Sequence, residues 1–279
     1  MEQCWAGIER PSHPLTLLPR LSAQKIEKLE SIGISDARHV PTDFSLSETQ
    51  ARIRDCHASG RPWASADLTA SLQSIQWPVT YLDFEANQFD IPRYAGTSPF
   101  QAIAFQLSCH RQERVDGPLD HNAYLADGSS DPRPELANAL LEAVGERGSI
   151  VVYSSYEART IRSLADACPS YKDDLLALLP RLVDLLQIVK AHYYHPDFMG
   201  SYSIKSVLPT LVPSYSYDAL EIADGRTAAR AWEAMINSPD DKSAETIRQD
   251  LLAYCELDSM AMAELHTALS SQPSSTSSE

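Results

Sequence analysis

Residues 79–85, Val-Thr-Tyr-Leu-Asp-Phe-Glu, decide how the rest of the chain is interpreted. The segment alternates like a β-strand, whose successive side chains point to opposite faces. Asp83 and Glu85 therefore share one face, and Phe84 points to the other. Two like charges so close together raise each other's pKa, and burying them is costly without a compensating cation. The segment is either a strand end that emerges into solvent before Asn87 or part of a cation site, and strand geometry favours neither.

The segments that follow this strand predict a mixed sheet with helices around it. Alternating or short apolar runs predict further strands at 100–109, 123–125 and 149–153. Apolar stripes at helical spacing predict helices at 134–144, 156–167, 182–192, 203–211, 225–236 and 245–269. Three strands, a helix, a strand and then several helices predict an α/β layer architecture with a mixed central sheet.

The first 77 residues predict a separate helical segment. We expect a helix over 23–31 capped by Ser22 and ended by Gly33, a short turn capped by Ser35, and a helix to His57 that starts from a capping box at 45–48. The sequence around Gly33 weakly resembles half of a helix-hairpin-helix motif, and an ordinary connection between two helices is the alternative. We expect an α/β domain over 78–269 and a disordered tail over 270–279.

Charge and composition exclude several classes of protein. The chain has 279 residues with 23 basic and 38 acidic side chains, so its net charge is −15, and nearly all of the excess follows residue 77. Such a balance disfavours a long basic track for duplex nucleic acid. No apolar run is long enough for a membrane span and no leader pattern is present, so we expect a cytoplasmic protein without membrane contact. The five scattered cysteines contain no C-x-x-C and predict reduced thiols.

An acidic residue lies within the apolar stripe of the last predicted helix. Asp258 recurs at helical spacing with Leu251, Tyr254 and Met262, so it is expected on the buried face. No Lys or Arg stands one turn away from it, and a buried carboxylate requires a partner. The partner is either an arginine elsewhere in the fold or a cation, and Tyr254 lies one turn before Asp258 on the same face.

A further acid, Glu157, follows the predicted strand at 149–153. The helix dipole alone explains an acid in the first turn of a helix. Together with Asp83, Glu85 and Asp258, however, it completes a set of oxygen ligands suited to Mg²⁺ or Mn²⁺. The sequence therefore predicts a site for a hard divalent cation.

These residues resemble a known class of enzymes. A D-x-E on the first strand, an acid after a middle strand and a final Y-x-x-x-D at 254–258 look like the DEDD class of 3′-to-5′ exonucleases, tyrosine subtype (DEDDy), in the ribonuclease H-like superfamily. The stretches 92–94, 99–101, 193–196 and 200–209 look similar to an uncharacterised bacterial family within it. That family often carries an upstream cysteine-rich nuclease-like domain, which we expect to be absent because only Cys4 precedes the helical segment.

The resemblance implies a ribonuclease H-like mixed central sheet flanked by helices and a two-metal hydrolysis of phosphodiesters, with ions about 3.5–4 Å apart. It implies that Asp83 bridges two Mg²⁺ or Mn²⁺ ions, Glu85 and Asp258 hold one of them, and Glu157 supports the other. Tyr254 would orient the attacking water. The implied substrate is the 3′ end of single-stranded DNA or RNA.

Two departures from the pattern concern the acids. The middle acid in this class is usually aspartate, whereas Glu157 is longer, and Asp184 matches a further acidic position that offers an outer-shell or substitute ligand. For substrate binding, Lys205 is a candidate phosphate contact and Phe84 a candidate stacking surface for a base, with a solvated lysine and core packing as the ordinary alternatives.

Two other functions remain open from the sequence. A catalytically degenerate module that binds nucleic acid or a partner protein would keep the fold and lose the chemistry. A zinc-dependent hydrolase would use His192, His195 and one acid, although two histidines without neighbouring acids or cysteines are a weak zinc pattern.

Overall fold

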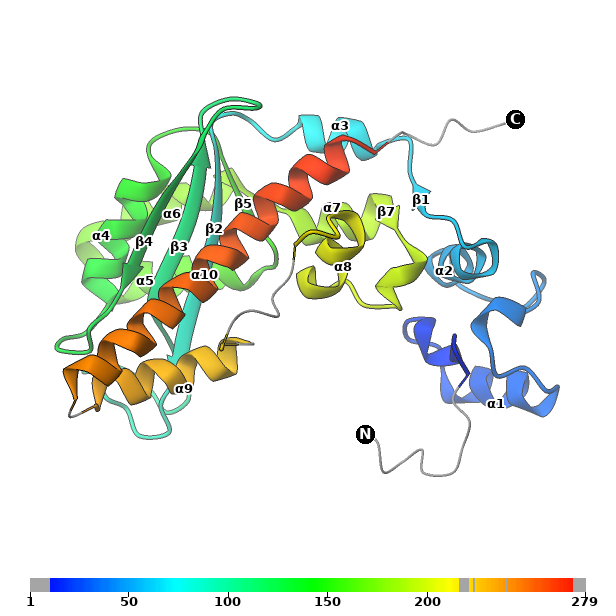
Figure 1. The fold of residues 1–279 in the computed structure, drawn as a ribbon, viewed down its shortest axis with the longest axis horizontal. Coiled ribbons are helices and arrows are strands. Elements are labelled where there is room, and N and C mark those ends of the chain that lie inside the picture. The colour runs from blue at the N-terminus through cyan, green and yellow to red at the C-terminus, as the bar shows by residue number, and fades with distance from the viewer. Residues whose placement is uncertain (1–10, 216–220, 223, 239, 273–279) are drawn as a thin grey trace.

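The computed structural model describes residues 11–215, 221–222, 224–238 and 240–272. Figure 1 shows an elongated molecule with two lobes, one around a β-sheet and one formed by the helices near the N-terminus. The α-helices are α1 (Ala23–Ser31), α2 (Glu48–Ser59), α3 (Leu68–Gln73), α4 (Arg133–Val144), α5 (Tyr156–Ala167), α6 (Lys172–Leu178), α7 (Leu185–His192), α8 (Ile204–Leu211), α9 (Gly225–Ile236) and α10 (Asp241–Ser270). None of the described helices is both long and apolar enough to cross a membrane.

The central sheet contains five strands in the order β4-β3-β2-β5-β6. They are β2 (Val79–Gln88), β3 (Ala102–Gln112), β4 (Leu119–Leu125), β5 (Ser149–Val152) and β6 (Leu182–Asp184). The first three pair antiparallel, whereas β5 runs parallel to β2, and β6 runs parallel to β5. The expected α/β architecture with a mixed sheet flanked by helices is confirmed.

The alternation of β2 places its side chains in different cores. Leu82 and Phe84 pack with α4, α5 and α6 on one face of the sheet. Val79 and Tyr81 face the other way and join a second core with α7, α8 and the C-terminal part of α10. Figure 1 shows α10 running across this second face, with α9 beside it. Asp83 and Glu85 therefore face the side that α10 covers.

Local signals explain where several elements begin. The Ser22 hydroxyl accepts a hydrogen bond from the Lys25 amide at the start of α1, as expected. The predicted capping box one turn before α2 was wrong, because Ser47 and Gln50 form it instead of Ser45 and Glu48.

Two further predictions need correction. Asp36, rather than Ser35, caps the next short turn, Ala37–His39, which is a single 3-10 turn, so the second α-helix of a helix-hairpin-helix does not form there. Residues 182–184 form β6 instead of the start of a helix. The extension of α10 to Ser270 also shortens the expected tail, whose residues 273–279 lie outside the described part.

A glycine lets the central strands begin side by side. Gly148 precedes β5 with φ +89°, a conformation that side chains rarely adopt, and a Cβ there would lie 1.8 Å from the Pro78 carbonyl oxygen. Arg181 fastens the same corner, since its guanidinium donates to the carbonyls of Val144, Gly145 and Gly148 at 2.6–2.9 Å. The parallel pairing of β5 with β2 is therefore secured at the edge opposite to the acids.

The N-terminal lobe contains residues from both ends of the sequence. Strand β1 (Trp63–Ala64) pairs antiparallel with β7 (Tyr193–Tyr194), and His57 and the Tyr194 hydroxyl are hydrogen-bonded at 2.9 Å. Apolar residues of α1, α2 and α3 share one continuous core with α7, α8 and the end of α10. The first 77 residues thus pack directly against the part of the chain that follows β6.

Candidate metal centre

The acids meet at the edge of the sheet where the parallel strands end. Strand β5 stops pairing with β2 at Val151, opposite Tyr81, so Asp83 and Glu85 extend just beyond the end of β5. Glu157 lies in the first turn of α5, directly after β5, and Asp184 is the last residue of β6. The carboxyl ends of the parallel strands therefore bring these side chains to one side of the sheet. The D-x-E pattern of Asp83 and Glu85 alone did not establish this arrangement.

Three of the carboxylates form a compact group, which we call the carboxylate group. Asp83 and Glu85 of β2 and Asp258 of α10 each offer an oxygen within 4.8 Å of the others. Glu85 is only 7% exposed, and the other two are partly buried. The Cys255 thiol donates to Asp83 Oδ2 at a distance of 3.5 Å. Two residues of α10 thus contact the strand that carries the D-x-E pattern.

Burial and mutual repulsion disfavour the ionised form of the acids in the carboxylate group. Removal from water raises the pKa of Asp83 well above its usual range, and the charges of Asp258 and Glu85 raise it further. Burial, followed by the charge of Asp258, raises the pKa of Glu85 to about 8, although Lys205 opposes this shift. At neutral pH the group therefore retains protons that a divalent cation would replace.

Tyr254 lies over the carboxylate group and is 3% exposed. Its hydroxyl is hydrogen-bonded to Asp258, and Lys205 Nζ lies 3.4 Å from the same oxygen and 5.0 Å from the ring centroid. Burial and the neighbouring carboxylates raise the pKa of Tyr254, so the phenol stays protonated. The structure thus brings Lys205 to the site through Tyr254.

Glu157 and Asp184 stand outside the compact group. Glu157 is 4% exposed, its Oε2 accepts a hydrogen bond from Ser154 Oγ at 3.2 Å, and burial raises its pKa to about 7. It lies near enough to raise the pKa of Asp83, but its oxygens are not among the three that meet within 4.8 Å. Asp184 caps α7 by accepting from the Gln187 amide. Because of these positions, Glu157 and Asp184 are weaker candidates for direct metal ligands than the three residues of the carboxylate group.

Other residues predicted for the site have structural surroundings. Phe84 is buried among α4 and α5 residues, which is the core packing that was the alternative to stacking on a base. His192 is hydrogen-bonded to Ser65 and Ser71, and His195 Nδ1 accepts from the Asp197 amide. A zinc hydrolase would need an acid that approaches both histidines, and none of the described residues forms such a group with them.

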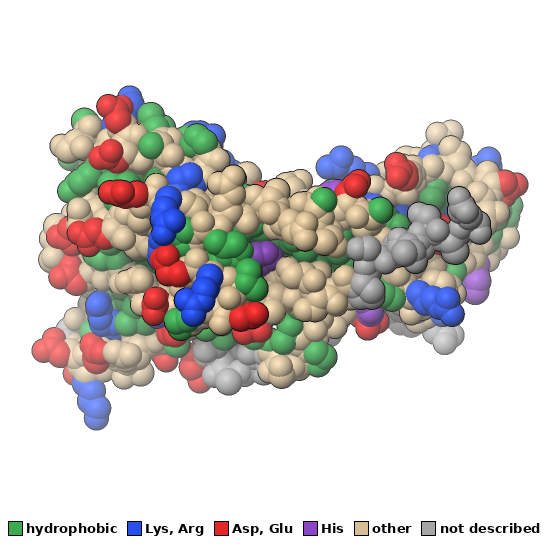
Figure 2. Space-filling view, turned by 90° about the horizontal axis from the view of Figure 1, so that it is seen from above, with side chains coloured by type: hydrophobic (Ala, Val, Ile, Leu, Met, Phe, Trp, Pro, Cys, Tyr) green, Lys and Arg blue, Asp and Glu red, His purple; other side chains and the backbone are tan. Residues whose placement is uncertain are grey.

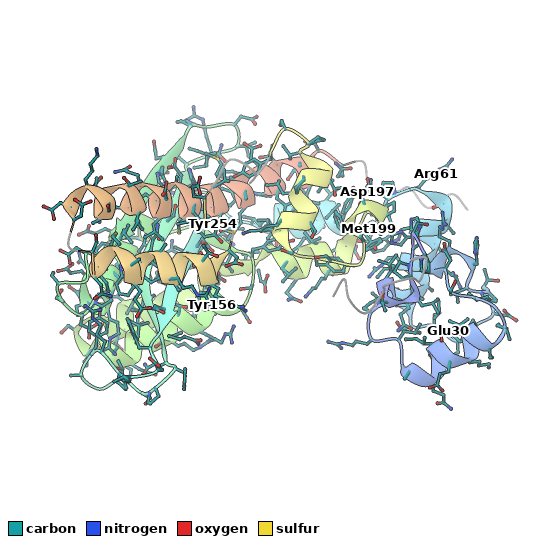
Figure 3. All side chains as sticks on the ribbon, turned by 60° about the horizontal axis from the view of Figure 1, so that its bottom comes forward. Glu30, Arg61, Tyr156, Asp197, Met199 and Tyr254 are labelled. Carbon is teal, nitrogen blue, oxygen red and sulfur yellow. The ribbon has the colours of Figure 1, made fainter. Side chains whose placement is uncertain are left out.

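The start of α9 is a part of the site that the sequence did not reveal. A Cβ on Gly225 would lie 3.0 Å from Glu85 Oε2, so the helix backbone comes close to the carboxylate group. Arg226 and Arg230 of α9, together with Tyr156 of α5, line a hollow of about 600 Å³ that reaches Glu85. In Figure 3, Tyr254 and Tyr156 appear on either side of the N-terminal end of α9.

This hollow continues along α5 as a trough. It shares Tyr156 and Gln88 with a second hollow of about 380 Å³, which shares Arg159 with a third of about 410 Å³. We call the whole the arginine trough, after the arginines that line it, Arg133, Arg159, Arg162, Arg226 and Arg230. In Figure 2, acidic and basic side chains of the described residues are interspersed over the face seen. Five arginines thus line the path that begins at Glu85, together with the acids Glu233 and Asp166.

Comparison with known proteins finds one family model that matches part of the chain. Residues 80–203 match the model of a family described as a domain of unknown function (DUF2779). The matched segment includes the acids of β2, α5 and β6 and ends before the site residues of α8 and α10. Neither the curated proteins nor the solved structures contain a match to the chain.

Proposed function

We propose that this protein is a ribonuclease H-like, metal-dependent 3′-to-5′ exonuclease that hydrolyses phosphodiester bonds at single-stranded DNA or RNA ends. The observation that carries the proposal is the carboxylate group itself. Asp83, Glu85 and Asp258 come from segments about 170 residues apart and still meet within 4.8 Å, beneath Tyr254. The mixed sheet agrees with the fold that the DEDD-type resemblance implies.

The residues present fit a pair of Mg²⁺ or Mn²⁺ ions. The donor set consists of carboxylate oxygens, which these hard cations prefer. The raised pKa values of Asp83 and Glu85 mean that their surroundings do not stabilise full ionisation, which supports divalent cations taking the place of the retained protons. Asp83, Glu85 and Asp258 would hold the ions, with Glu157 as a ligand through water and Asp184 as an outer-shell group. When bound, such ions would lower the pKa of a water molecule and neutralise charge on the phosphate.

The remaining groups would position the reactants. Tyr254 keeps its proton, so its hydroxyl is a hydrogen-bond partner that orients water and does not accept a proton from it. Lys205 Nζ lies 3.4 Å from that hydroxyl. At this position the positive charge of the lysine would also attract a substrate phosphate. Tyr254 and Lys205 thus lie together next to the proposed metal ligands.

The arginine trough supports a single-stranded substrate. A flexible strand can follow a narrow trough from the carboxylate group past Arg226 and Arg159, with phosphates near the guanidinium groups. The mixed charge on the face seen in Figure 2 offers less attraction to a long duplex, whose binding depends on clustered cations. We therefore expect cleavage to begin at a free single-stranded 3′ end.

The test is cleavage of 5′-labelled single strands, which a 3′-to-5′ exonuclease shortens into a ladder. We expect the wild type to degrade DNA or RNA strands in Mn²⁺ or Mg²⁺ and to leave a strand with a blocked 3′ end intact. Asp83→Asn should remove this activity. The matched control is Asp43→Asn, which makes the same chemical change at an exposed position of the N-terminal lobe. Cleavage that persists in Asp83→Asn would refute the proposal.

One observation favours the degenerate binding module as a second candidate. Glu157, which replaces the more usual aspartate, lies outside the group of three carboxylates. If Glu157 cannot support a second ion, the site would bind a strand end without cutting it. Tight strand binding by the wild type without cleavage in any divalent cation would identify this function.

A further inference from the structure

A second group of metal-binding side chains lies beside the carboxylate group; we call it the histidine cluster. His110 of β3 and His121 of β4 are directly opposite in strand register, and their rings stack with centroids 4.6 Å apart. Glu256 of α10 approaches them, with Oε1 3.6 Å from His121 Nδ1. One potential ligand atom of each residue lies within 4.8 Å of those of the other two. Two imidazoles and one carboxylate form a donor set typical of Zn²⁺.

Each imidazole of the histidine cluster is hydrogen-bonded to a serine through one of its two nitrogens. Ser259 Oγ lies 2.9 Å from His110 Nδ1, and Ser108 Oγ lies 2.9 Å from His121 Nε2. The two hydroxyls are also hydrogen-bonded to each other at 2.8 Å. Metal-binding histidines usually have such a partner on the second nitrogen, which fixes the tautomer and the ring orientation. The bonds leave Nε2 of His110 and Nδ1 of His121 for an ion.

One of the three distances is near the value that a tetrahedral ion requires, and the other two are within 4.8 Å. With metal–ligand bonds of about 2.0–2.1 Å, neighbouring ligand atoms lie about 3.3 Å apart. The 3.6 Å separation of His121 and Glu256 is close to this value. The two rings are nearly parallel, with 20° between their planes, so the His121 ring must turn to direct its lone pair at an ion that His110 also binds. The side chains of His121 and Glu256 are 27% and 47% exposed and have room to turn, whereas His110 is fixed in the core at 1% exposure.

We propose that His110, His121 and Glu256 bind one Zn²⁺ ion, with water in the fourth position, at a site separate from the carboxylate group. The ion would link α10 to the β3–β4 hairpin. Its serine partners adjoin the other site, because Ser108 is opposite Asp83 in the β2–β3 register and Ser259 follows Asp258. The zinc would therefore hold in place the helix that carries Tyr254 and Asp258. This inference stands independently of any nuclease activity.

The experiment measures Zn²⁺ binding by calorimetry to the full chain after treatment with a chelator. An Asp83→Asn background disables the carboxylate group, so that zinc there does not obscure the result. In this background we expect one Zn²⁺ per chain. We expect His121→Ala to weaken binding by about 100-fold or more, and Ser108→Ala, which removes only an orienting hydroxyl, by about 10–100-fold.

The matched control is His195→Ala, which removes another partly exposed imidazole, 23% exposed, and should leave the affinity unchanged. Cobalt in place of zinc should give the visible absorption of a tetrahedral ion in the background chain and lose it in His121→Ala. Melting temperatures without metal check that each variant is folded. The proposal is overturned if folded His121→Ala binds zinc as tightly as its parent, or if the Asp83→Asn background binds no zinc.

Discussion

The carboxylate group, on β2 and α10, and the histidine cluster, on β3, β4 and α10, lie side by side, yet their side chains are arranged in opposite ways. The carboxylate group contains only acids, and each raises the pKa of its neighbours. The histidine cluster is ordered by two serines that are hydrogen-bonded to each other. A site of the first kind needs cations to relieve repulsion, whereas a site of the second kind is already stable without an ion. Under the two proposals, α10 carries a ligand of the catalytic ions, Asp258, and a ligand of the supporting zinc, Glu256, two residues apart.

The largest effect is expected from removing a ligand of the carboxylate group, which distinguishes this site from the histidine cluster. Asp258→Asn removes a ligand of the carboxylate group and should lower Mn²⁺-dependent cleavage by about 10³-fold or more, because a site that depends on metal ions loses its charge balance. Glu245→Gln changes an exposed acid of the same helix and serves as the control. The measurement is the rate of ladder formation at saturating strand. If Asp258→Asn keeps more than a tenth of the activity, the carboxylate group is not the catalytic centre.

A smaller loss is expected from the residue above the carboxylates. Tyr254→Phe keeps the ring in its buried position but removes the hydroxyl that contacts Asp258 and Lys205. We expect kcat to fall about 10–100-fold, as for the loss of one positioning group, while the Mn²⁺ concentration for half-maximal activity stays within about 3-fold. An equal shift in both quantities would show that Tyr254 supports the ligands instead of the water.

The charge repulsion in the carboxylate group predicts an unusual dependence of stability on pH. Folding raises the pKa of Glu85 from 4.5 to about 8, so between these values the folded apoprotein binds more protons than the unfolded chain. The free energy of unfolding should therefore decrease as the pH rises through this window. At about pH 8.5, Glu85→Gln should raise the melting temperature of the apoprotein by a few degrees, about 1–2 kcal/mol.

The control for this effect is the same pair of proteins in saturating Mn²⁺. The cation stabilises the wild type in place of the proton, so the advantage of Glu85→Gln should disappear or reverse. A wild-type apoprotein whose stability increases from about pH 6 to about pH 8.5 would contradict the pKa shifts and, with them, the contrast between the two sites.

The smallest expected effect tests which of the two sites the arginine trough serves. The double change Arg159→Ala with Arg226→Ala removes two exposed charges along the trough. KM for a single strand should rise about 3–10-fold and depend less steeply on salt, with kcat nearly unchanged. Arg147→Ala removes an arginine that is 77% exposed elsewhere and is the control. Equal effects of the two changes would argue for non-specific attraction.

The sequence predicted elements well where a local signal marks both ends. The helices at 156–167 and 225–236 have the predicted limits, and the strand from Val79 was recognised by its alternation. Strand β6 was missed because its three residues continue directly into the apolar stripe of α7, so periodicity alone does not separate them. The capping box was misplaced because Ser45 and Ser47 both precede the helix, and only the second has Gln50 in reach.

The candidate site was predictable to a similar extent. Asp83, Glu85 and Asp258 each break a local pattern, as charged residues in a strand or in an apolar stripe, and the structure brings all three together. The histidine cluster breaks no pattern, because His110 and His121 become neighbours only through the register of β3 with β4. Gly225 and the arginine trough likewise depend on how α9 packs, which no short stretch of sequence encodes.

The shared core of the N-terminal lobe matters for anyone who wishes to shorten this protein. Leu29 and Ile53 of the first 77 residues belong to the same apolar core as Val207 of α8, the helix that also carries Lys205. A fragment that begins at Pro78 would expose that face of α8 to water. Lys205 would then no longer be held next to the carboxylate group. The described part of the N-terminal lobe, residues 11–77, therefore supports α8 and through it the position of Lys205, although none of these residues belongs to the carboxylate group.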